Sequence, residues 1–177
     1  GSLRVEVKEL AQKDVWQSRQ FDGTTVTKDS KINMGNLTIN GTSIDTTNKS
    51  YSDLVTEINK ISGVQASLIE SSDGKFRLAI KSTETGTANK INFNTKDISG
   101  NDLGVSSGAA KLFGDGSALS DSLNVLKAQD MQLKADGVDY SSSSNTITID
   151  GLKITATKKG GDSTINIEND TTTLSAQ

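Results

Sequence analysis

Hydrophobic and polar residues alternate over several short stretches, and turn signals separate these stretches. Leu37 and Ile39 alternate with polar neighbours, the pair Asn40-Gly41 follows, and Ile44 comes next. Asn-Gly between alternating stretches is a strong sign of a hairpin, because both residues tolerate the positive φ angles of a two-residue turn. The pattern therefore predicts a β-hairpin over residues 37–45.

After this hairpin the hydrophobic period changes from about 3.6 residues to two. Ser50 and Asp53 are spaced as in a capping box, and Leu54, Ile58 and Ile61 would share one helical face. Gly63 stands where a left-handed residue would end this helix. Alternation then resumes on both sides of a Ser-Ser-Asp-Gly turn, so residues 37–81 are predicted as strand, strand, helix, strand, strand.

Alternation also returns late in the chain, after a stretch without clear periodicity. From Ile91 to Gly116, isolated Leu and Phe residues stand among glycines, which predicts irregular loops. Beyond residue 130, short alternating stretches meet at Asp136-Gly137 and Asp150-Gly151, which predicts a meander of antiparallel strands. Such a meander is half of a sandwich, and its partners could be alternating stretches near the N-terminus.

These patterns lead to one prediction of fold class. Only 32% of the residues are hydrophobic and 4% are aromatic, so the cores must be small and aliphatic. We expect a mainly β chain (β or α+β) with one or two short helices, built as two small antiparallel β-sandwich-like domains. Residues 1–28 and 127–177 would form a discontinuous domain, with residues 30–126 inserted into it.

Composition excludes several kinds of chemistry. The chain has no Cys and no His, which removes disulfides, thiolate ligands and imidazole bases. A net charge of −3 without a run of basic residues argues against nucleic-acid binding, and no apolar stretch approaches the ~18 residues of a membrane span. We expect no cofactor, no metal, no nucleic-acid partner and no membrane insertion.

A few acidic and hydroxyl groups still allow other interpretations. The carboxylate pairs Asp45 with Asp53 and Asp136 with Asp139 could act as acid and base in sugar hydrolysis. Aspartates at turns and caps usually bond their own backbone, however, and we favour that role. Residues 113–116 and 167–173 could suggest calcium, but neither has the ligand spacing of a known loop. No activated nucleophile is visible, so the chain is predicted not to be an enzyme.

Two further features have a structural and a functional interpretation. Trp16, the only tryptophan, could stack on a sugar or a partner protein, but a core position is the favoured prediction. The serine run 141–144 is predicted to be a flexible loop.

Three blocks of sequence together resemble one family. They begin at Val5, Leu37 and Ala128, and they resemble the flagellar filament cap protein family, also called hook-associated protein 2, over most of the chain except residues 96–120. The middle block resembles the IN motif shared by flagellins and hook-associated proteins. The family often has Arg shortly before its Ser-Asn pair, where this chain has serines. The family-motif residues are Leu10, Ala11, Ile58, Asn59, Gly63, Val64, Ala66, Asp136, Gly137, Val138, Ser144, Asn145 and Gly151.

The resemblance implies a function that needs no reactive site. It implies the middle portion of a secreted protein of the bacterial flagellum, without that family's terminal coiled-coil segments. Copies would form an oligomeric plate at the filament tip, beneath which exported flagellin folds and polymerises. The partners would be other copies of the same protein and flagellin. The alternative is a tip-exposed adhesin for host mucin or glycans, and which residues form subunit interfaces is left open.

Overall fold

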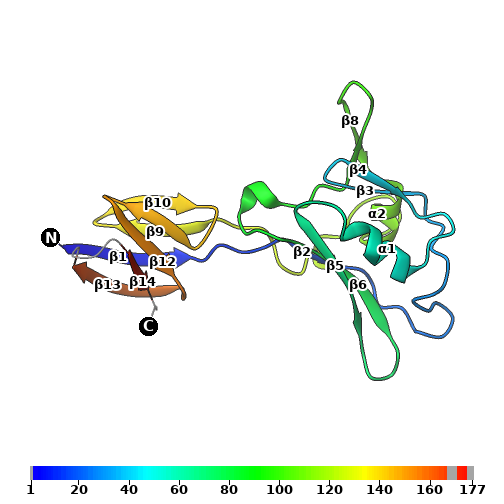
Figure 1. Cartoon of the computed structure of the whole chain (residues 1–177), viewed down its shortest axis with the longest axis horizontal. Coiled ribbons are helices and arrows are strands. Elements are labelled where there is room, and N and C mark those ends of the chain that lie inside the picture. Colours follow the sequence, from blue (N-terminus) through cyan, green and yellow to red (C-terminus); the bar gives the residue numbers. More distant parts are fainter. Residues whose placement is uncertain (1, 167–170, 175–177) are drawn as a thin grey trace. The chain divides into compact units, whose positions relative to one another are not determined.

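The computed structural model describes residues 2–166 and 171–174. The chain divides into two compact units, each with its own hydrophobic core (Figure 1). Unit 1 consists of Gly1–Asp14, Glu84–Lys90 and Lys127–Gln177, and unit 2 consists of Val15–Thr83 and Ile91–Leu126.

This division differs from the predicted boundaries in two places. The strand β2 (Val15–Gln17) and the residues up to 28 belong to unit 2, whereas Glu84–Lys90 belongs to unit 1. The reason for the first difference is packing: β2 pairs with a strand of unit 2, and Trp16 and Phe21 are buried in that unit's core. The second segment is held by hydrogen bonds to other parts of unit 1.

Unit 1 is built from two small sheets. One sheet has the order β10-β9-β1-β13, formed by Val138–Ser142, Met131–Ala135, Ser2–Glu9 and Gly160–Asn166. The other has the order β11-β12-β14, formed by Thr146–Ile149, Leu152–Ala156 and Thr171–Leu174. Alternation along β1, β9 and β12 buries every second side chain in one aliphatic core. A short 3₁₀ turn, η1 (Thr87–Asn89), also lies in this unit.

The predicted meander is confirmed in its antiparallel hairpins. β9 and β10 meet at Asp136-Gly137, and β11 and β12 meet at Asp150-Gly151, with positive φ at all four residues. The N-terminal strand β1 pairs antiparallel with β9. One pair, β12 with β14, is parallel, which the sequence pattern did not predict.

Unit 2 combines a three-stranded sheet with short helices and hairpins. Its sheet has the order β2-β6-β5, with β5 at Val64–Glu70 and β6 at Phe76–Ser82. The helix α1 (Tyr51–Ile58) and the hairpin of β3 (Asn36–Ile39) and β4 (Thr42–Asp45) share one core with this sheet. The remaining elements are β7 (Asn94–Lys96), β8 (Asp102–Val105), α2 (Ser107–Leu112) and the 3₁₀ turn η2 (Asp121–Leu123).

The predicted hairpin and helix of unit 2 are confirmed. Leu37 pairs with Ile44 across the hairpin. Ser50 caps α1, because its Oγ accepts from the Asp53 N–H at 3.0 Å while the Asp53 carboxylate accepts from the Ser50 N–H at 3.2 Å. Leu54 is fully buried on the inner face of this helix. The prediction for residue 61 is only partly right, because α1 ends before it.

The prediction of irregular loops from residue 91 to 116 is wrong. β7 and β8 form a hairpin in this region, and α2 follows with Phe113 buried behind it. α2 packs closely on β3, since a Cβ atom at Gly108 would lie 2.8 Å from the carbonyl oxygen of Asn36. Small residues therefore define this helix, and a hydrophobic period does not reveal it.

The serine run is also more ordered than predicted. Ser141 and Ser142 belong to β10, and the Ser142 Oγ donates to the Thr146 carbonyl at 2.9 Å. Only Ser143 and Ser144 lie in the bend between β10 and β11. Of the helices that the structure describes, none is long and apolar enough to cross a membrane.

Candidate functional site

The family-motif residues of unit 2 hold an edge strand. Asn59 follows α1, and its side-chain amide pairs with both backbone groups of Ala66 on β5. The Ala66 N–H donates to Asn59 Oδ1 at 2.8 Å, and Asn59 Nδ2 donates to the Ala66 carbonyl at 3.1 Å. β5 is the edge of its sheet, so this amide takes the place of a neighbouring strand.

The other motif residues at this point connect the helix to the strand. Ile58 and Val64 are buried in the core of unit 2. Between them, Gly63 has a φ of +89° with no atom near its missing Cβ, so it is needed for backbone conformation and not for space. The IN-like motif is thus a structural connection from α1 to β5.

In unit 1 the motif residues bring together segments that are distant in sequence. Asn145 Oδ1 accepts from the backbone N–H of Ala11 at 2.7 Å, a contact across 134 positions. The Asn145 carbonyl accepts from the Ala156 N–H at 2.7 Å. The carbonyl of Leu10 accepts from Gln129 Nε2 at 2.7 Å.

The segment 84–90 completes this arrangement. Thr85 Oγ1 donates to the Ser143 carbonyl at 2.7 Å, and the Gly86 N–H donates to the Gln12 carbonyl at 3.0 Å. A Cβ atom at position 86 would lie 2.8 Å from Ser143. Asp130 then accepts from the Thr87 N–H at 2.9 Å. We name this meeting of residues 10–12, 85–87, 129–130 and 143–145 the unit 1 junction.

The family resemblance names only part of the junction. Leu10, Ala11, Ser144 and Asn145 are motif residues, but nothing in the sequence singled out the segment 85–87 or Gln129. Their contacts join segments tens of residues apart, and local periodicity carries no such information.

The remaining motif residues form the hairpin turns of unit 1. Asp136 ties its turn to β1, because its Oδ1 accepts from the Arg4 N–H at 2.8 Å and its own N–H donates to the Arg4 carbonyl at 2.8 Å. Gly137 and Gly151 are the second residues of their turns. Val138 begins β10 and is half exposed.

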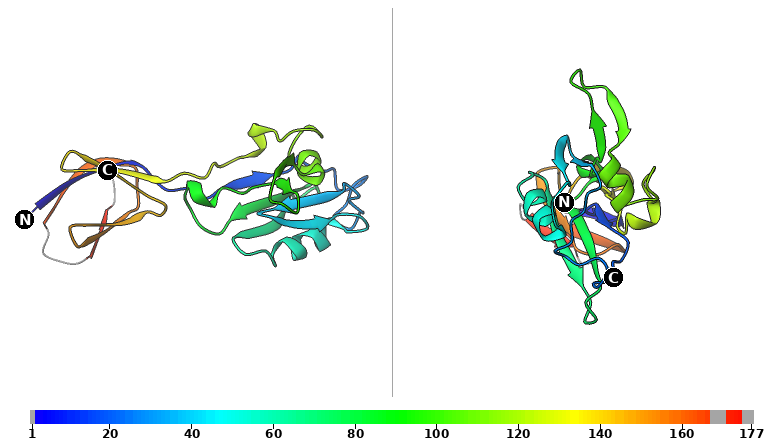
Figure 2. Two further views of the ribbon diagram at one scale, coloured as in Figure 1. Left: turned by 90° about the horizontal axis from the view of Figure 1, so that it is seen from above. Right: turned by 90° about the vertical axis from the view of Figure 1, so that its right-hand side faces the viewer.

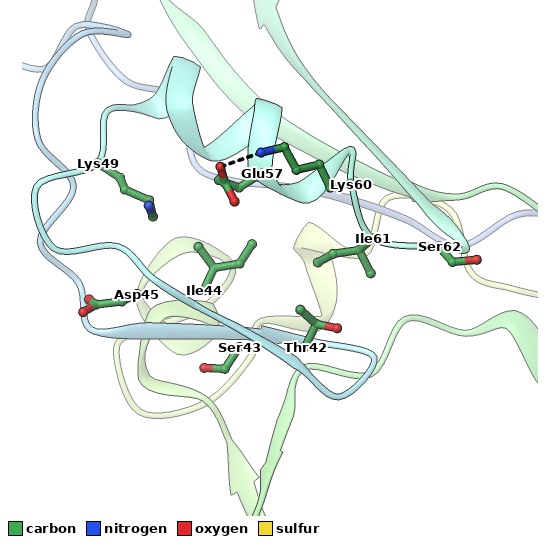
Figure 3. Close-up of a pocket in the computed structure, with 9 residues that line it drawn as sticks. All are labelled: Thr42, Ser43, Ile44, Asp45, Lys49, Glu57, Lys60, Ile61 and Ser62. Carbon is green, nitrogen blue, oxygen red and sulfur yellow. Dashed lines mark hydrogen bonds and ion pairs between the residues drawn. The ribbon is translucent and has the colours of Figure 1, made fainter.

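One surface pocket lies in unit 2 between α1 and the β3–β4 hairpin (Figure 3). It has a volume of about 430 Å³. Glu57 and Lys60 pair with each other at 3.1 Å on its α1 side, and Lys49 and Asp45 also line it. None of the nine residues drawn in Figure 3 is aromatic. The pocket can therefore offer hydrogen bonds and charge but no aromatic ring for stacking.

The aspartates proposed as an acid–base pair bond to the backbone. The Thr47 backbone N–H donates to Asp45 at 2.9 Å and lowers the pKa of that carboxyl, and the Ser50 backbone N–H lowers the pKa of Asp53. A general acid near neutral pH needs a raised pKa. Asp136 binds the backbone of β1, and Asp139 lies 3.8 Å from the Lys134 ammonium. These contacts favour structural roles for all four carboxylates.

The other candidate sites also resolve into structural contacts. Asp115 in the segment 113–116 accepts from the Ser117 and Ala118 N–H groups at 2.9 and 2.8 Å, and these bonds lower its pKa. Residues 167–170 of the second segment lie outside the described residues. Within the described part of the chain, no group of three or more acidic side chains is placed to hold a metal ion.

Trp16 lies in the core, as predicted. It is 5% exposed, and its ring packs edge-on against Phe93 and Phe113 at centroid distances of 5.5 and 6.3 Å. It therefore has no free face on which to stack a sugar.

Comparison with known proteins gives a consistent result in sequence and in structure. Flagellar hook-associated protein 2 of Campylobacter jejuni is 29% identical to this chain over an alignment of 201 positions. The alignment covers 96% of this chain and 31% of that protein. The protein of the same name from Escherichia coli K12 is 32% identical over 161 residues, which cover 84% of this chain and 32% of that protein. No protein-family model matches the chain.

Solved structures show the same fold. The D2-D3 domains of the flagellar cap protein FliD from Escherichia coli match with a TM-score of 0.65 and 25% identity, over 93% of this chain and 85% of that one. The D2-D3 domains of FliD from Serratia marcescens match with a TM-score of 0.63 and 25% identity, over 95% and 93% of the two chains.

The chain therefore has the D2-D3 fold of flagellar cap proteins. Its relatives are flagellar hook-associated protein 2 of two bacteria, which confirms the resemblance and the mainly β fold predicted from the sequence. The chain spans about a third of the length of these relatives.

Proposed function

We propose that this chain is part of a structural subunit of the flagellar filament cap. The subunits form an oligomeric plate at the filament tip, outside the cell, and exported flagellin folds and polymerises beneath it. The observation that carries this proposal is the joint match of sequence and fold to flagellar cap proteins over most of the chain. Such a role is steric and non-covalent, so it needs no enzyme chemistry and no cofactor.

The contacts of the motif residues support a role as rigid blocks. Asn145 and Asp136 direct their polar side chains to backbone groups of segments more than 130 positions away, and Asn59 does the same for the neighbouring strand β5. We infer that these family-motif residues serve the fold. Ring closure then multiplies weak contacts between copies.

The proposal is tested in motile cells that lack their own cap protein. The intact gene product containing these 177 residues should restore filaments of normal length, measured by electron microscopy, and should reduce flagellin lost to the medium. An Asn145→Ala variant should restore filaments less well, because it breaks the unit 1 junction, whereas Ser43→Ala on the exposed β4 should match the parent. Exported, folded protein that leaves flagellin unpolymerised would contradict the proposal.

The pocket in Figure 3 favours a second role, as a tip-exposed adhesin for host mucin or glycans. The hydroxyl groups of Thr42 and Ser43 line the pocket together with acidic and basic side chains, which suits the hydrogen-bonding groups of a sugar. On a glycan array the chain should bind a defined set of glycans. Lys49→Ala in the pocket should reduce that signal, and Lys75→Ala in an exposed turn should not. An array without a signal above background would exclude this role.

A further inference from the structure

The hairpin of β7 and β8 carries apolar side chains into solvent. Ile98 in its turn is fully exposed, and Leu103 on β8 is 62% exposed. Figure 1 shows this hairpin, near the label β8, projecting from the rest of unit 2. Single exposed apolar residues are common, but a turn normally carries Gly, Asn, Asp or Ser, so an isoleucine there calls for an explanation.

The turn that presents Ile98 is held by its own hydrogen bonds. Asp97 accepts from the backbone N–H groups of Ser99 at 2.9 Å and Asn101 at 2.8 Å, and from Asn101 Nδ2 at 3.0 Å. The Gly100 N–H donates to the Asp97 carbonyl at 3.0 Å. A turn ordered in this way loses little conformational entropy when it binds, as an interface anchor requires.

A matching hollow lies on the outer face of the sheet of unit 2. Leu78 on β6 faces the core, so the next residue, Ala79, faces outward. Gln17 on β2 and Ser67 on β5 are the partners of Ala79 in the sheet. This row lines a pocket of about 490 Å³, in which Ala79 and Ser67 are small and Ile69 is 43% exposed.

The two surfaces also differ in the charges at their rims. Asp97 and Asp102 flank the apolar residues of the hairpin, and Lys96 is its one cation, so the hairpin has a net negative charge. Lys81 lines the pocket, and Arg77 is the strand partner of Ile69 at its edge. An apolar anchor in a shallow pocket, with opposite charges at the rim, is the usual composition of a protein interface.

We propose that the Ile98 turn of one copy inserts into the Ala79 pocket of a second copy of this chain. This inference rests on the proposed cap function, because it names the contact by which the subunits associate. The β7–β8 and β5–β6 hairpins project from opposite sides of unit 2 (Figures 1 and 2). A contact of this kind uses two different patches, so it is head-to-tail and can close into a ring.

Cross-linking tests the contact directly, because the chain has no native cysteine. The intact gene product, with any cysteine outside these residues changed to serine, is prepared with Ile98→Cys or with Ser67→Cys and the two are mixed under mild oxidation. The mixed disulfide should form at least tenfold more than with Ser43→Cys, another exposed serine, on β4. Equal yields with both serine positions would overturn the inference.

Sedimentation of the same protein separates this inference from the proposed function. Ile98→Ser should weaken self-association by roughly tenfold to a hundredfold, because an isoleucine loses its burial, and Ser99→Ala should change it less than twofold. Oligomers that form equally well with Ile98→Ser would overturn the contact and leave the cap function standing. A protein without oligomers would contradict both. If Ile98→Ser instead lost flagellin or glycan binding while its self-association stayed unchanged, the Ile98 turn would contact that other partner. This result would overturn the inference.

Discussion

Asn59 illustrates how one side chain can complete a sheet. Its amide satisfies both backbone groups of Ala66, and each such hydrogen bond contributes about 0.5–1.5 kcal/mol. We therefore expect Asn59→Ala to lower the free energy of unfolding of unit 2 by about 1–3 kcal/mol. Urea denaturation measures this change, and hydrogen exchange should show faster exchange of the Ala66 amide.

Two further variants make this test specific. Asn59→Asp keeps the acceptor and loses the donor, so its effect should lie between those of Asn59→Ala and the parent. Gln65→Ala, an exposed position on the same strand, should change stability by less than about 0.5 kcal/mol. An unchanged exchange rate at Ala66 in Asn59→Ala would refute the role of the amide.

Asp22 gives a prediction about pH. Hydrogen bonds from the backbone N–H of Val26 at 3.0 Å and of Thr24 at 2.9 Å lower the pKa of this carboxyl from 3.8 to about 2. A lowered pKa in the folded state stabilises the fold above pH 3.8, and this contribution is lost as the pH falls from about 4 to about 2. NMR titration should give a midpoint near 2 for Asp22, and the Thr24 and Val26 amide shifts should move with it. A midpoint near 4 would mean that these bonds do not form.

At the scale of elements, α1 is stabilised by packing more than by its cap. Leu54 is fully buried, and removal of such a side chain usually costs about 2–5 kcal/mol. Loss of an N-cap such as Ser50 costs about 1 kcal/mol. We expect Leu54→Ala to destabilise unit 2 more than Ser50→Ala does, as measured by urea denaturation. Thr56→Ala, on the exposed face of α1, is the control and should have little effect. If Leu54→Ala, Ser50→Ala and Thr56→Ala had equal urea midpoints, the inner face of α1 would be wrongly assigned.

The elements that the sequence predicts are those with local signals. α1 has a capping box and a helical period, and the β3–β4 hairpin has Asn-Gly between alternating stretches. The helix α2 has neither, because Gly108 and its alanine neighbours are selected by close approach to β3, about 70 residues earlier. The β7–β8 turn depends on hydrogen bonds to Asp97 rather than on an alternating pattern.

At the scale of the whole molecule, the unit 1 junction could not be predicted from local patterns. Its contact between Ala11 and Asn145 spans 134 positions, and the segment 84–90 joins it from within a run assigned to the other unit. The family resemblance named Ala11 and Asn145 but gave no contact between them. The boundary at residue 28 was misplaced for a similar reason, because the burial of Trp16 and Phe21 beside β6 is a long-range property.

The separate cores of the two units lead to a prediction about cooperativity. The buried side chains form two clusters, one containing Leu133 in unit 1 and one containing Leu54 in unit 2. Trp16 is the only tryptophan and belongs to unit 2, so its fluorescence reports on that unit alone. We propose that the units unfold as separate bodies. Leu54→Ala should then lower the urea midpoint of Trp16 fluorescence, whereas Leu133→Ala should leave it unchanged.

Hydrogen exchange supplies the reciprocal measurement. Leu133→Ala should cost unit 1 about 2–5 kcal/mol and expose the amides of β1 and β9, while the β5 and β6 amides keep their protection. Leu54→Ala should have the opposite pattern. If both variants moved the Trp16 midpoint by the same amount, the units would unfold as one cooperative body. If the two units unfold independently, a substitution on the surface of unit 2, such as Ile98→Ser, leaves the sheets of unit 1 folded.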